Sequence, residues 1–343
     1  MARRNQFFWK KSRFFGKKRT LAFFLAIVFF FLTATMGRSF FSIIRTTFAS
    51  PDYSVTLDAW DGQEPLTVVV GSDPVRVFSY SPLEKRLIVV SIPGDTLVTV
   101  PYGYGAYRLK AVVDLGALDT ARSGPELLMH SVQEFLAIPI DGYIDPGIVN
   151  QGGNVLENIR NAWKRPDRLL SSSTTTLKPL DIFRLFTAIA AVRMDRISFI
   201  DLSNAGITTA STRADGQDVL NIEQGRLDRA LSENMPTRLS RGGERVQAIV
   251  LNGTGQEGLA KGFARYLEHL GAVVIQLGNA ATPVERTSVV GLEGAHERYD
   301  ISRILRPFCQ EGCIAANGDV NNGLIVVTIG SDFEKFLSGA SSR

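Results

Sequence analysis

A glycine-rich turn near the end of the chain is the first place where residue types and spacing could do chemistry. Gly253, Gly255 and Gly258 match the G-x-G-x-x-G pattern between a predicted strand and a predicted helix, the context of a dinucleotide phosphate loop. Such a site also needs an Asp or Glu about twenty residues later to hold the ribose. Residues 276–279 read Gln-Leu-Gly-Asn and offer no carboxylate. The sequence therefore favours tight turn packing over cofactor binding.

Two cysteines, Cys309 and Cys313, lie four residues apart and are the only cysteines of the chain. Two cysteines exclude a disulfide-rich framework. In an oxidising exterior they could form one local bridge that stabilises the fold modestly, and the alternative is two unpaired small residues at a helix end. A zinc site is not expected, because two thiols alone are too few ligands and the histidines, His130, His269 and His296, are scattered.

An apolar run near the N-terminus indicates on which side of a membrane these residues lie. Residues 20–37 are eighteen uncharged residues, which give about 27 Å of helix against a hydrocarbon core of about 30 Å. Residues 1–19 contain eight Lys or Arg and no Asp or Glu, so the positive-inside rule places them in the cytoplasm. The sequence predicts a single-pass membrane protein whose C-terminal domains are extracytoplasmic, and a cleaved signal peptide is the alternative.

The net charge of +4 is unevenly distributed along the chain. Because residues 1–19 hold eight positive charges, residues 20–343 hold 30 Lys and Arg against 34 Asp and Glu, a net of −4. A nucleic-acid-binding protein would carry its basic residues on a folded domain. The charge distribution therefore indicates a topology signal at the N-terminus and predicts no nucleic-acid partner.

Hydrophobic periodicity divides the rest of the chain into two globular parts. We expect a juxtamembrane connector over 38–65, a first domain over 66–202, a connector over 203–244 with one helix at 222–231, a second domain over 245–336 and a tail over 337–343. Strands are predicted at 66–70, 86–92, 197–202, 246–251, 273–277 and 324–329. Helices are predicted at 126–136, 180–192, 259–270 and 296–308. Strands alternating with helices predict an α/β layer fold, and the second domain begins with a βαβ unit.

The second domain resembles a known family. The similarity lies in residues 246–260 (Val-Gln-Ala-Ile-Val-Leu-Asn-Gly-Thr-Gly-Gln-Glu-Gly-Leu-Ala), in Gly278-Asn-Ala280 with Thr287, and in residues 325–333 (Ile-Val-Val-Thr-Ile-Gly-Ser-Asp-Phe). These motifs are similar to the LytR C-terminal domain (LytR_C), found at the end of many bacterial envelope proteins. That family has no established catalytic role. The resemblance therefore implies a binding or scaffolding module.

The first domain resembles the LytR-CpsA-Psr (LCP) family of membrane-anchored enzymes, which move wall glycopolymers from polyprenyl-pyrophosphate lipids onto peptidoglycan. The resemblance lies, in matching order and spacing, in residues 89–96 (Val-Val-Ser-Ile-Pro-Gly-Asp-Thr), 104–110, 124–128 and 135–143. It implies a divergent LCP-like α/β domain anchored in a bacterial cell membrane. The implied partners are the membrane and a cell-wall glycan or polyprenyl-linked polymer.

The LCP resemblance also indicates which residues could form a site. Transfer from a lipid pyrophosphate needs a divalent cation held by carboxylates, and guanidinium groups on the phosphate oxygens. Gly94 stands where the family has an arginine, and the family's arginine-rich stretch has no counterpart. The candidates that remain for binding an anion or a metal are Asp73, Arg76, Asp95, Arg108 and Lys110. Each also has an ordinary interpretation as a turn residue, a strand-end cap or a surface charge.

The missing arginines bear on whether the chain is an enzyme. Each lost donor costs about 2.7 to 4 kcal/mol of transition-state stabilisation, so two or three losses abolish practical turnover. We therefore expect a pseudoenzyme, a binding or scaffold protein of the cell envelope that needs no cofactor. The alternative is an active transferase, which would use Mg²⁺.

Overall fold

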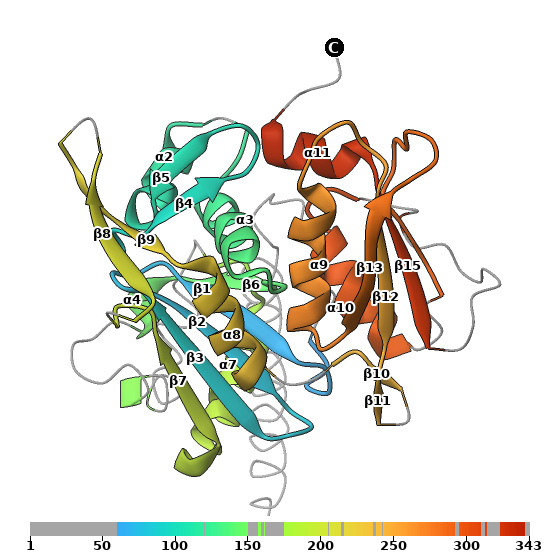
Figure 1. Cartoon of the computed structure of the whole chain (residues 1–343). Helices are drawn as coiled ribbons and strands as arrows, with labels where there is room; N and C mark the ends of the chain where they lie inside the picture. The colour runs from blue at the N-terminus through green and yellow to red at the C-terminus, as the bar shows by residue number, and fades with distance from the viewer. Residues whose placement is uncertain are drawn as a thin grey trace, which may run out of the picture. The chain divides into compact units, whose positions relative to one another are not determined.

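The computed structural model describes residues 60–119, 121–149, 157–158, 161, 175–204, 206–213, 216–235, 238–241, 243–291, 295–309, 313 and 323–339 (Figure 1). These residues belong to one compact unit, Pro51–Arg343. The predicted basic tail (1–19), the apolar run (20–37) and most of the juxtamembrane connector lie outside the described residues. Within the described ranges, no helix is both long and apolar enough to cross a membrane.

The first domain is built on a five-stranded mixed sheet with the strand order β6-β1-β2-β3-β7. The central strands β1 (Leu66–Val70), β2 (Val75–Ser81) and β3 (Arg86–Ile92) are antiparallel. β6 (Gly142–Ile144) and β7 (Ile197–Asp201) add in parallel to β1 and β3. The bounds of β1 and β3 are those predicted from the sequence. β2 is not predicted, because Arg76, Ser79 and Ser81 interrupt its apolar residues.

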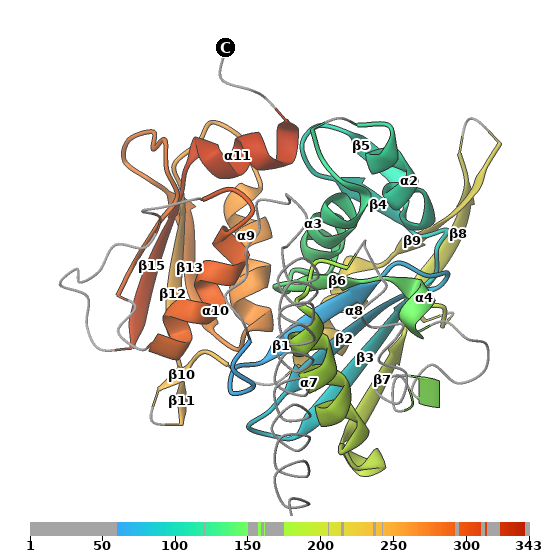
Figure 2. The same cartoon turned by 180° about the vertical axis from the view of Figure 1, so that it is seen from behind.

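Two helices cover the two faces of this sheet (Figures 1 and 2). Successive side chains of a strand point to opposite faces. Val69 therefore packs in the cluster that contains α3 (Gly124–Leu136), whereas Val68 packs in the cluster that contains α7 (Pro179–Ala190). Ser123 caps α3 by accepting a hydrogen bond from the backbone N–H of Glu126. Both helices lie where the sequence predicts them.

The segment 203–244 contains more structure than the predicted connector. It holds the hairpin of β8 (Thr208–Thr212) and β9 (Asp218–Ile222), then α8 (Gln224–Asn234). Leu227 and Leu231 of α8 are fully buried in the core of the first domain. The hairpin is hard to predict because its residues are mostly polar and exposed. The described residues also contain the short elements η1 (Leu109–Ala111), α2 (Val112–Ala117), α4 (Pro146–Val149), η2 (Met194–Arg196), β10 (Ser240–Arg241) and β11 (Glu244–Arg245).

The second domain has a four-stranded sheet with the order β13-β12-β15-β14. Its strands are β12 (Gln247–Asn252), β13 (Val273–Asn279), β14 (Ser288–Val290) and β15 (Leu324–Ile329). β12 and β13 are parallel and are joined by α9 (Leu259–His269), which is the predicted βαβ unit. α9, α10 (Ala295–Leu305) and α11 (Ser331–Ser338) contribute to the single buried cluster of this domain.

The glycine-rich turn of the second domain serves backbone packing. A Cβ atom at Gly253 would lie 2.6 Å from the carbonyl oxygen of Ile329, so only glycine fits between β12 and β15 at that point. Gly258 has φ of 87°, a left-handed conformation that favours glycine at the start of α9.

A buried ion pair joins the two domains. Arg303 of α10 contacts the carboxylate of Asp141, and its Nη1 donates to the carbonyl of Pro65 at 3.0 Å. Oδ2 of Asp141, which also contacts Nη2 of Arg303, accepts from the backbone N–H of Thr67 in β1 at 2.7 Å. Asp141 and Arg303 are 1% and 2% exposed. Because a charge removed from water needs such partners, this pair ties α10 to the edge of the first sheet.

Further polar contacts extend the same interface. Arg238 lies between Asp300 of α10 (3.4 Å) and Ser79 of β2 (3.2 Å). On the other side of the interface, Tyr266 of α9 donates to Glu134 of α3 at 2.7 Å. Arg265 of α9 donates to Asp228 of α8 and to the carbonyl of Phe135 in α3. Helices α9 and α10 therefore bind the first domain along α3, α8 and the sheet.

α11 makes a third contact with the first domain, at the turn between β4 (Leu97–Val100) and β5 (Gly105–Arg108). Tyr102 in this turn donates its backbone N–H to the carbonyl of Phe336 at 2.7 Å. Its hydroxyl is 2.8 Å from Nδ1 of His130 in α3. Burial, helped by the charge of Arg122, lowers the pKa of His130 to about 3. His130 is therefore a neutral component of the core at physiological pH.

Removing the guanidinium of the interdomain ion pair should destabilise the whole unit. Arg303→Met leaves the Asp141 carboxylate buried without its partner, which costs about 3 to 5 kcal/mol. Arg303→Met with Asp141→Leu should recover part of this loss, because no charge is then left uncompensated. Urea unfolding measures both effects. Arg193→Met, which breaks an exposed ion pair with Asp195, is the matched control and should cost under about 1 kcal/mol. Equal losses in the two single variants would contradict this assignment.

The neutral state of His130 gives the fold a defined acid sensitivity. Below about pH 6.5 the unfolded chain protonates this imidazole, while the folded protein holds it neutral down to about pH 3. The unfolded state then binds more protons, so the free energy of unfolding falls as the pH falls, by up to about 1.4 kcal/mol per pH unit. His130→Gln should remove this contribution. Urea unfolding at pH 7, 6, 5 and 4 tests it, and parallel curves for wild type and variant would refute it.

Candidate anion-binding site

Three of the five candidate residues meet beside the end of β3. Asp95 follows β3, Arg108 is the last residue of β5, and Lys110 lies in η1 directly after it. Lys110 Nζ is 2.7 Å and Arg108 Nη1 is 3.4 Å from the same oxygen, Oδ1 of Asp95. The three side chains are 30 to 44% exposed. A ligand in solution can therefore reach both cations.

Backbone hydrogen bonds hold these three residues in register. The N–H of Lys110 donates to the carbonyl of Gly94, and the N–H of Leu109 donates to the carbonyl of Thr96, both at 2.9 Å. β4 and β5 pair antiparallel, with Leu97 opposite Arg108. The hairpin thus brings the chain back beside the end of β3. Asp95 therefore lies next to Arg108 and Lys110, which are thirteen and fifteen positions later in the sequence.

Asp73 contacts Gly94, the residue before Asp95. It belongs to the turn between β1 and β2, and its Oδ1 accepts the backbone N–H of Gly94 at 3.1 Å. A Cβ atom at Gly94 would lie 2.7 Å from that oxygen and 2.9 Å from Cβ of Lys110. No side chain fits at Gly94 unless these neighbours move. The position that holds an arginine in the LCP family is thus closed in this chain.

Arg76 points to a different part of the first domain. It alternates along β2 with Val75 and Val77, which face α3, so its side chain lies on the α7 face of the sheet. Its Nη1 is 3.4 Å from Oγ of Ser72, and burial lowers the pKa of its guanidinium. Asp73 and Lys110 therefore border Gly94, Asp95 follows it, and Arg108 contacts Asp95. Arg76 occupies the same end of the sheet on the opposite face.

The electrostatics of this group, Asp73, Asp95, Arg108 and Lys110, are those of a neutralised cluster. The hydrogen bond from Lys110, together with the charge of Arg108, lowers the pKa of Asp95. The LCP resemblance implies Mg²⁺, which prefers an octahedral shell of oxygen ligands. As arranged, Oδ1 of Asp95 accepts from two cations and Oδ1 of Asp73 accepts a backbone N–H. This arrangement does not fit a metal, and it presents the two cations to an anion instead.

The β8–β9 hairpin borders the cluster, a feature the sequence did not predict. Leu220 of β9 donates its backbone N–H to the carbonyl of Asp95 at 3.0 Å. Nη1 of Arg213, just after β8, donates to the carbonyl of Ala106 in β5 at 3.2 Å. The sequence does contain a signal for this hairpin, since residues 208–212 are rich in β-branched threonine and Gly216 follows in a turn.

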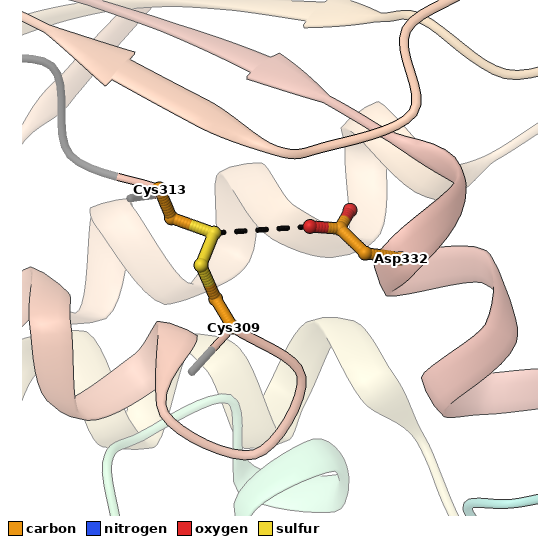
Figure 3. A group of neighbouring side chains, drawn as sticks. All are labelled: Cys309, Cys313 and Asp332. Carbon is orange, nitrogen blue, oxygen red and sulfur yellow. Dashed lines mark hydrogen bonds between the residues drawn. A yellow bond between two sulfur atoms is a disulfide. The ribbon is translucent and has the colours of Figure 1, made fainter. Parts of the chain in front are cut away.

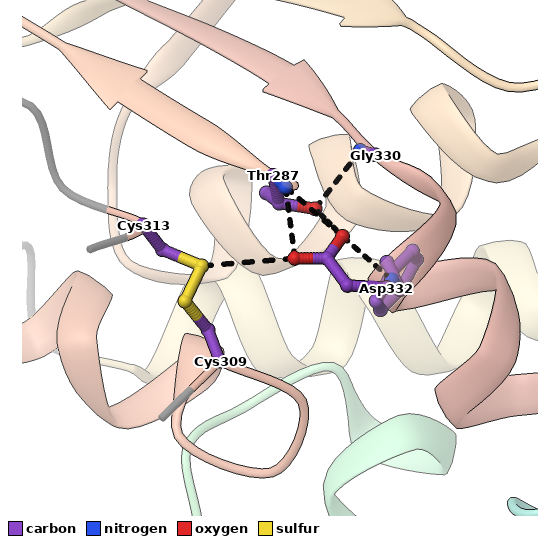
Figure 4. Close-up of a disulfide and its surroundings, with 6 residues drawn as sticks. Thr287, Cys309, Cys313, Gly330 and Asp332 are labelled. Atoms are coloured by element: carbon purple, nitrogen blue, oxygen red, sulfur yellow. Dashed lines mark hydrogen bonds between the residues drawn. A yellow bond between two sulfur atoms is a disulfide. The ribbon is translucent and has the colours of Figure 1, made fainter. Parts of the chain in front are cut away.

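The two cysteines are joined by a disulfide in the second domain (Figure 3). Cys313 Sγ lies 3.7 Å from the carboxylate of Asp332 at the start of α11. That carboxylate also accepts from the N–H and the hydroxyl of Thr287 and from the N–H of Phe333 (Figure 4). These three residues, Cys309, Cys313 and Asp332, are the only group with metal-ligand spacing in the described part of the chain. With both sulfurs in the bridge and the carboxylate engaged, they do not form a metal site.

The closed position at Gly94 can be tested by adding one carbon atom. Gly94→Ala should cost about 1 to 3 kcal/mol of stability, because its Cβ overlaps Asp73 and Lys110. Asp73→Ala in the same chain should relieve part of that cost. Thermal unfolding measures both. Gly262→Ala in α9, where a Cβ meets no atom within 4 Å, is the control and should be neutral or stabilising. The same outcome at both glycines would mean that position 94 is open.

Comparison with known proteins supports the assignment of the second domain. Residues 245–333 match the LytR_C family, described as LytR cell envelope-related transcriptional attenuator. This match confirms the resemblance predicted from residues 246–260 and 325–333. It covers less than half of the chain. No curated protein matches the sequence.

Several solved structures are similar to the chain at low identity. One is YwtF (TagT) of Bacillus subtilis, a LytR-CPS2A-psr family protein with bound octaprenyl pyrophosphate lipid, at 17% identity over 55% of this chain and 96% of that chain, with a TM-score of 0.37. Another is a transcriptional regulator from Enterococcus faecalis, at 16% identity over 52% of this chain and 89% of that chain, with a TM-score of 0.39.

Proposed function

We propose that this chain is a cell-envelope protein that binds the anionic head group of a lipid-linked glycopolymer and holds the polymer without transferring it. The proposal rests on the LCP resemblance of residues 89–96 and 104–110, on the LytR_C match, and on the cluster around Gly94. In this proposal the apolar run 20–37 anchors the chain in a bacterial cell membrane, and both domains face outward.

The binding step follows from the charges of the cluster. Arg108 and Lys110 are both held by one oxygen of Asp95, and all three are partly exposed. A diphosphate offers several strong acceptor oxygens and competes with Asp95 for the two cations. Arginine can also bind two phosphate oxygens at once, which fixes the orientation of the head group.

The closed position at Gly94 is the observation that favours binding over transfer. Group transfer from a diphosphate needs cationic donors placed where charge develops on the leaving group. A donor at position 94 would have to displace Asp73 and Lys110, whose atoms lie within 3 Å of the missing Cβ. The two cations that remain suffice to hold a head group but leave the leaving-group charge without a third donor.

The transferase stays as a second candidate because Asp73 and Asp95 flank the same glycine. If a substrate draws Lys110 and Arg108 away from Asp95, Oδ1 of Asp95 loses the two cations that it contacts. Two carboxylates and substrate phosphates are the usual ligands of Mg²⁺. The two candidates therefore differ in whether magnesium is needed for release of the lipid.

Neutralising either cation should weaken head-group binding. Arg108→Gln and Lys110→Gln each remove a charge-assisted hydrogen bond, and we expect about a tenfold loss of affinity for each. The full chain in lipid nanodiscs, titrated calorimetrically with farnesyl diphosphate in EDTA, provides the measurement. Arg193→Gln, on an exposed surface of the same domain, is the charge-matched control. Unchanged affinity in both cluster variants would exclude this site.

A turnover assay separates the two candidates. The full chain is incubated with a lipid-linked glycan and peptidoglycan, with and without magnesium. The binding proposal expects no release of polyprenyl pyrophosphate in either condition. Strictly magnesium-dependent release, lost in Asp73→Asn and Asp95→Asn, would overturn that proposal and establish the transferase.

A further inference from the structure

The β4–β5 hairpin connects the candidate site to the second domain. Asp95 precedes β4, and Arg108 closes β5, so the base of the hairpin carries the charged residues. The turn at its other end, residues 101–104, contacts α11 of the second domain. Four residue pairs join the two strands, from Leu97 opposite Arg108 to Val100 opposite Gly105.

Backbone contacts fix this turn on α11. The N–H groups of Tyr102 and Gly103 donate to the carbonyls of Phe336 and Leu337, at 2.7 and 3.2 Å. These are carbonyls of the last turn of α11, which lack partners inside the helix. A Cβ atom at Gly103 would lie 2.4 Å from the carbonyl oxygen of Ser338, so turn and helix end are in direct contact.

Aromatic side chains complete the contact. The rings of Tyr102 and Phe336 meet edge to face with centroids 5.1 Å apart, and Phe336 also lies 5.9 Å from the ring of His130. The guanidinium of Arg122 lies 3.4 Å over the ring of Tyr102, a cation–π contact. Tyr102 has φ of 65°, a left-handed conformation that a bulky residue adopts only when its surroundings enforce it.

We infer that α11 of the second domain positions the anion-binding cluster, with Phe336 and Tyr102 as the positioning residues. A two-stranded hairpin is marginally stable by itself. Here Val98 and Val100 of β4 are buried in the core of the first domain, whereas β5 is mostly exposed. β5 is held by its pairing with β4, by Arg213 on the carbonyl of Ala106, and at its turn by α11. Releasing the turn lets the strands move relative to each other, and Arg108, 3.4 Å from Asp95, moves with β5. That the cluster binds an anion rests on the proposed function. The coupling between α11 and the cluster does not depend on it.

Hydrogen exchange of the full chain tests the coupling without a ligand. Phe336→Ala removes the ring that Tyr102 packs on. We expect the amides of residues 105–110 to exchange about tenfold faster in this variant. Phe186→Ala is the matched control, because Phe186 of α7 is a fully buried aromatic residue in the cluster on the other face of the first sheet, which contains no residue of α11 or of the hairpin. The control should change exchange of residues 105–110 by less than about twofold.

Binding of inorganic pyrophosphate to the same proteins gives the second readout. Phe336→Ala should weaken it about fivefold, and Phe336→Leu, which keeps an apolar contact, should recover most of the affinity. Equal exchange of residues 105–110 in the Phe336→Ala and Phe186→Ala variants would overturn the inference. Should Phe336→Ala unfold, exchange in Tyr102→Gly decides instead, because glycine suits the φ of 65° and the change removes the ring that packs on Phe336. Protection of residues 105–110 equal to wild type in that variant would overturn the inference. Faster exchange with no pyrophosphate binding by wild type would support the coupling and refute the proposed function.

Discussion

The contact between Arg303 and Asp141 is the interaction on which the arrangement of the two domains depends. Two opposite charges are removed from water at the interface. The cost is offset by hydrogen bonds with the backbone of Thr67 and Pro65 and by Asp300, whose Oδ1 lies 3.3 Å from Nη1 of Arg303. Those backbone groups belong to β1 and the residue before it, next to the edge strand β6 of the first sheet. The position of α10, and with it the second domain, is therefore set by the first sheet.

The candidate site depends indirectly on the arrangement of the two domains. Its charged residues lie at the base of a hairpin whose turn is bound by α11, and α11 is held in the core of the second domain by Phe333. The site is thus assembled from residues of the first domain and supported by the second. Within it, Gly94 brings Asp73 and Lys110 close together, and the same closeness excludes the arginine of the LCP family.

Much of the fold follows from the sequence, because the strands at 66–70, 86–92 and 324–329 are continuous apolar runs and the helices at 126–136 and 259–270 have clear apolar faces. The polar hairpin at 208–222 does not follow from the sequence, since the pairing of its two strands defines it and its residues show no hydrophobic periodicity. The cluster of Asp95, Arg108 and Lys110 was indicated by family resemblance alone. Its geometry needs the backbone bonds of Leu109 and Lys110, which no residue pattern encodes.

The ion pair at the interface also limits how freely the second domain can be exchanged. The LytR_C match suggests that residues 245–333 form a domain that could be exchanged for a homologous one. Asp141, however, is complementary to an arginine at one position of α10, and a homologous domain with another residue there would leave a carboxylate buried without a countercharge. In this chain the two domains can therefore diverge only together. A substitution at position 141 limits which residues position 303 can hold, and a substitution at position 303 limits position 141 in the same way.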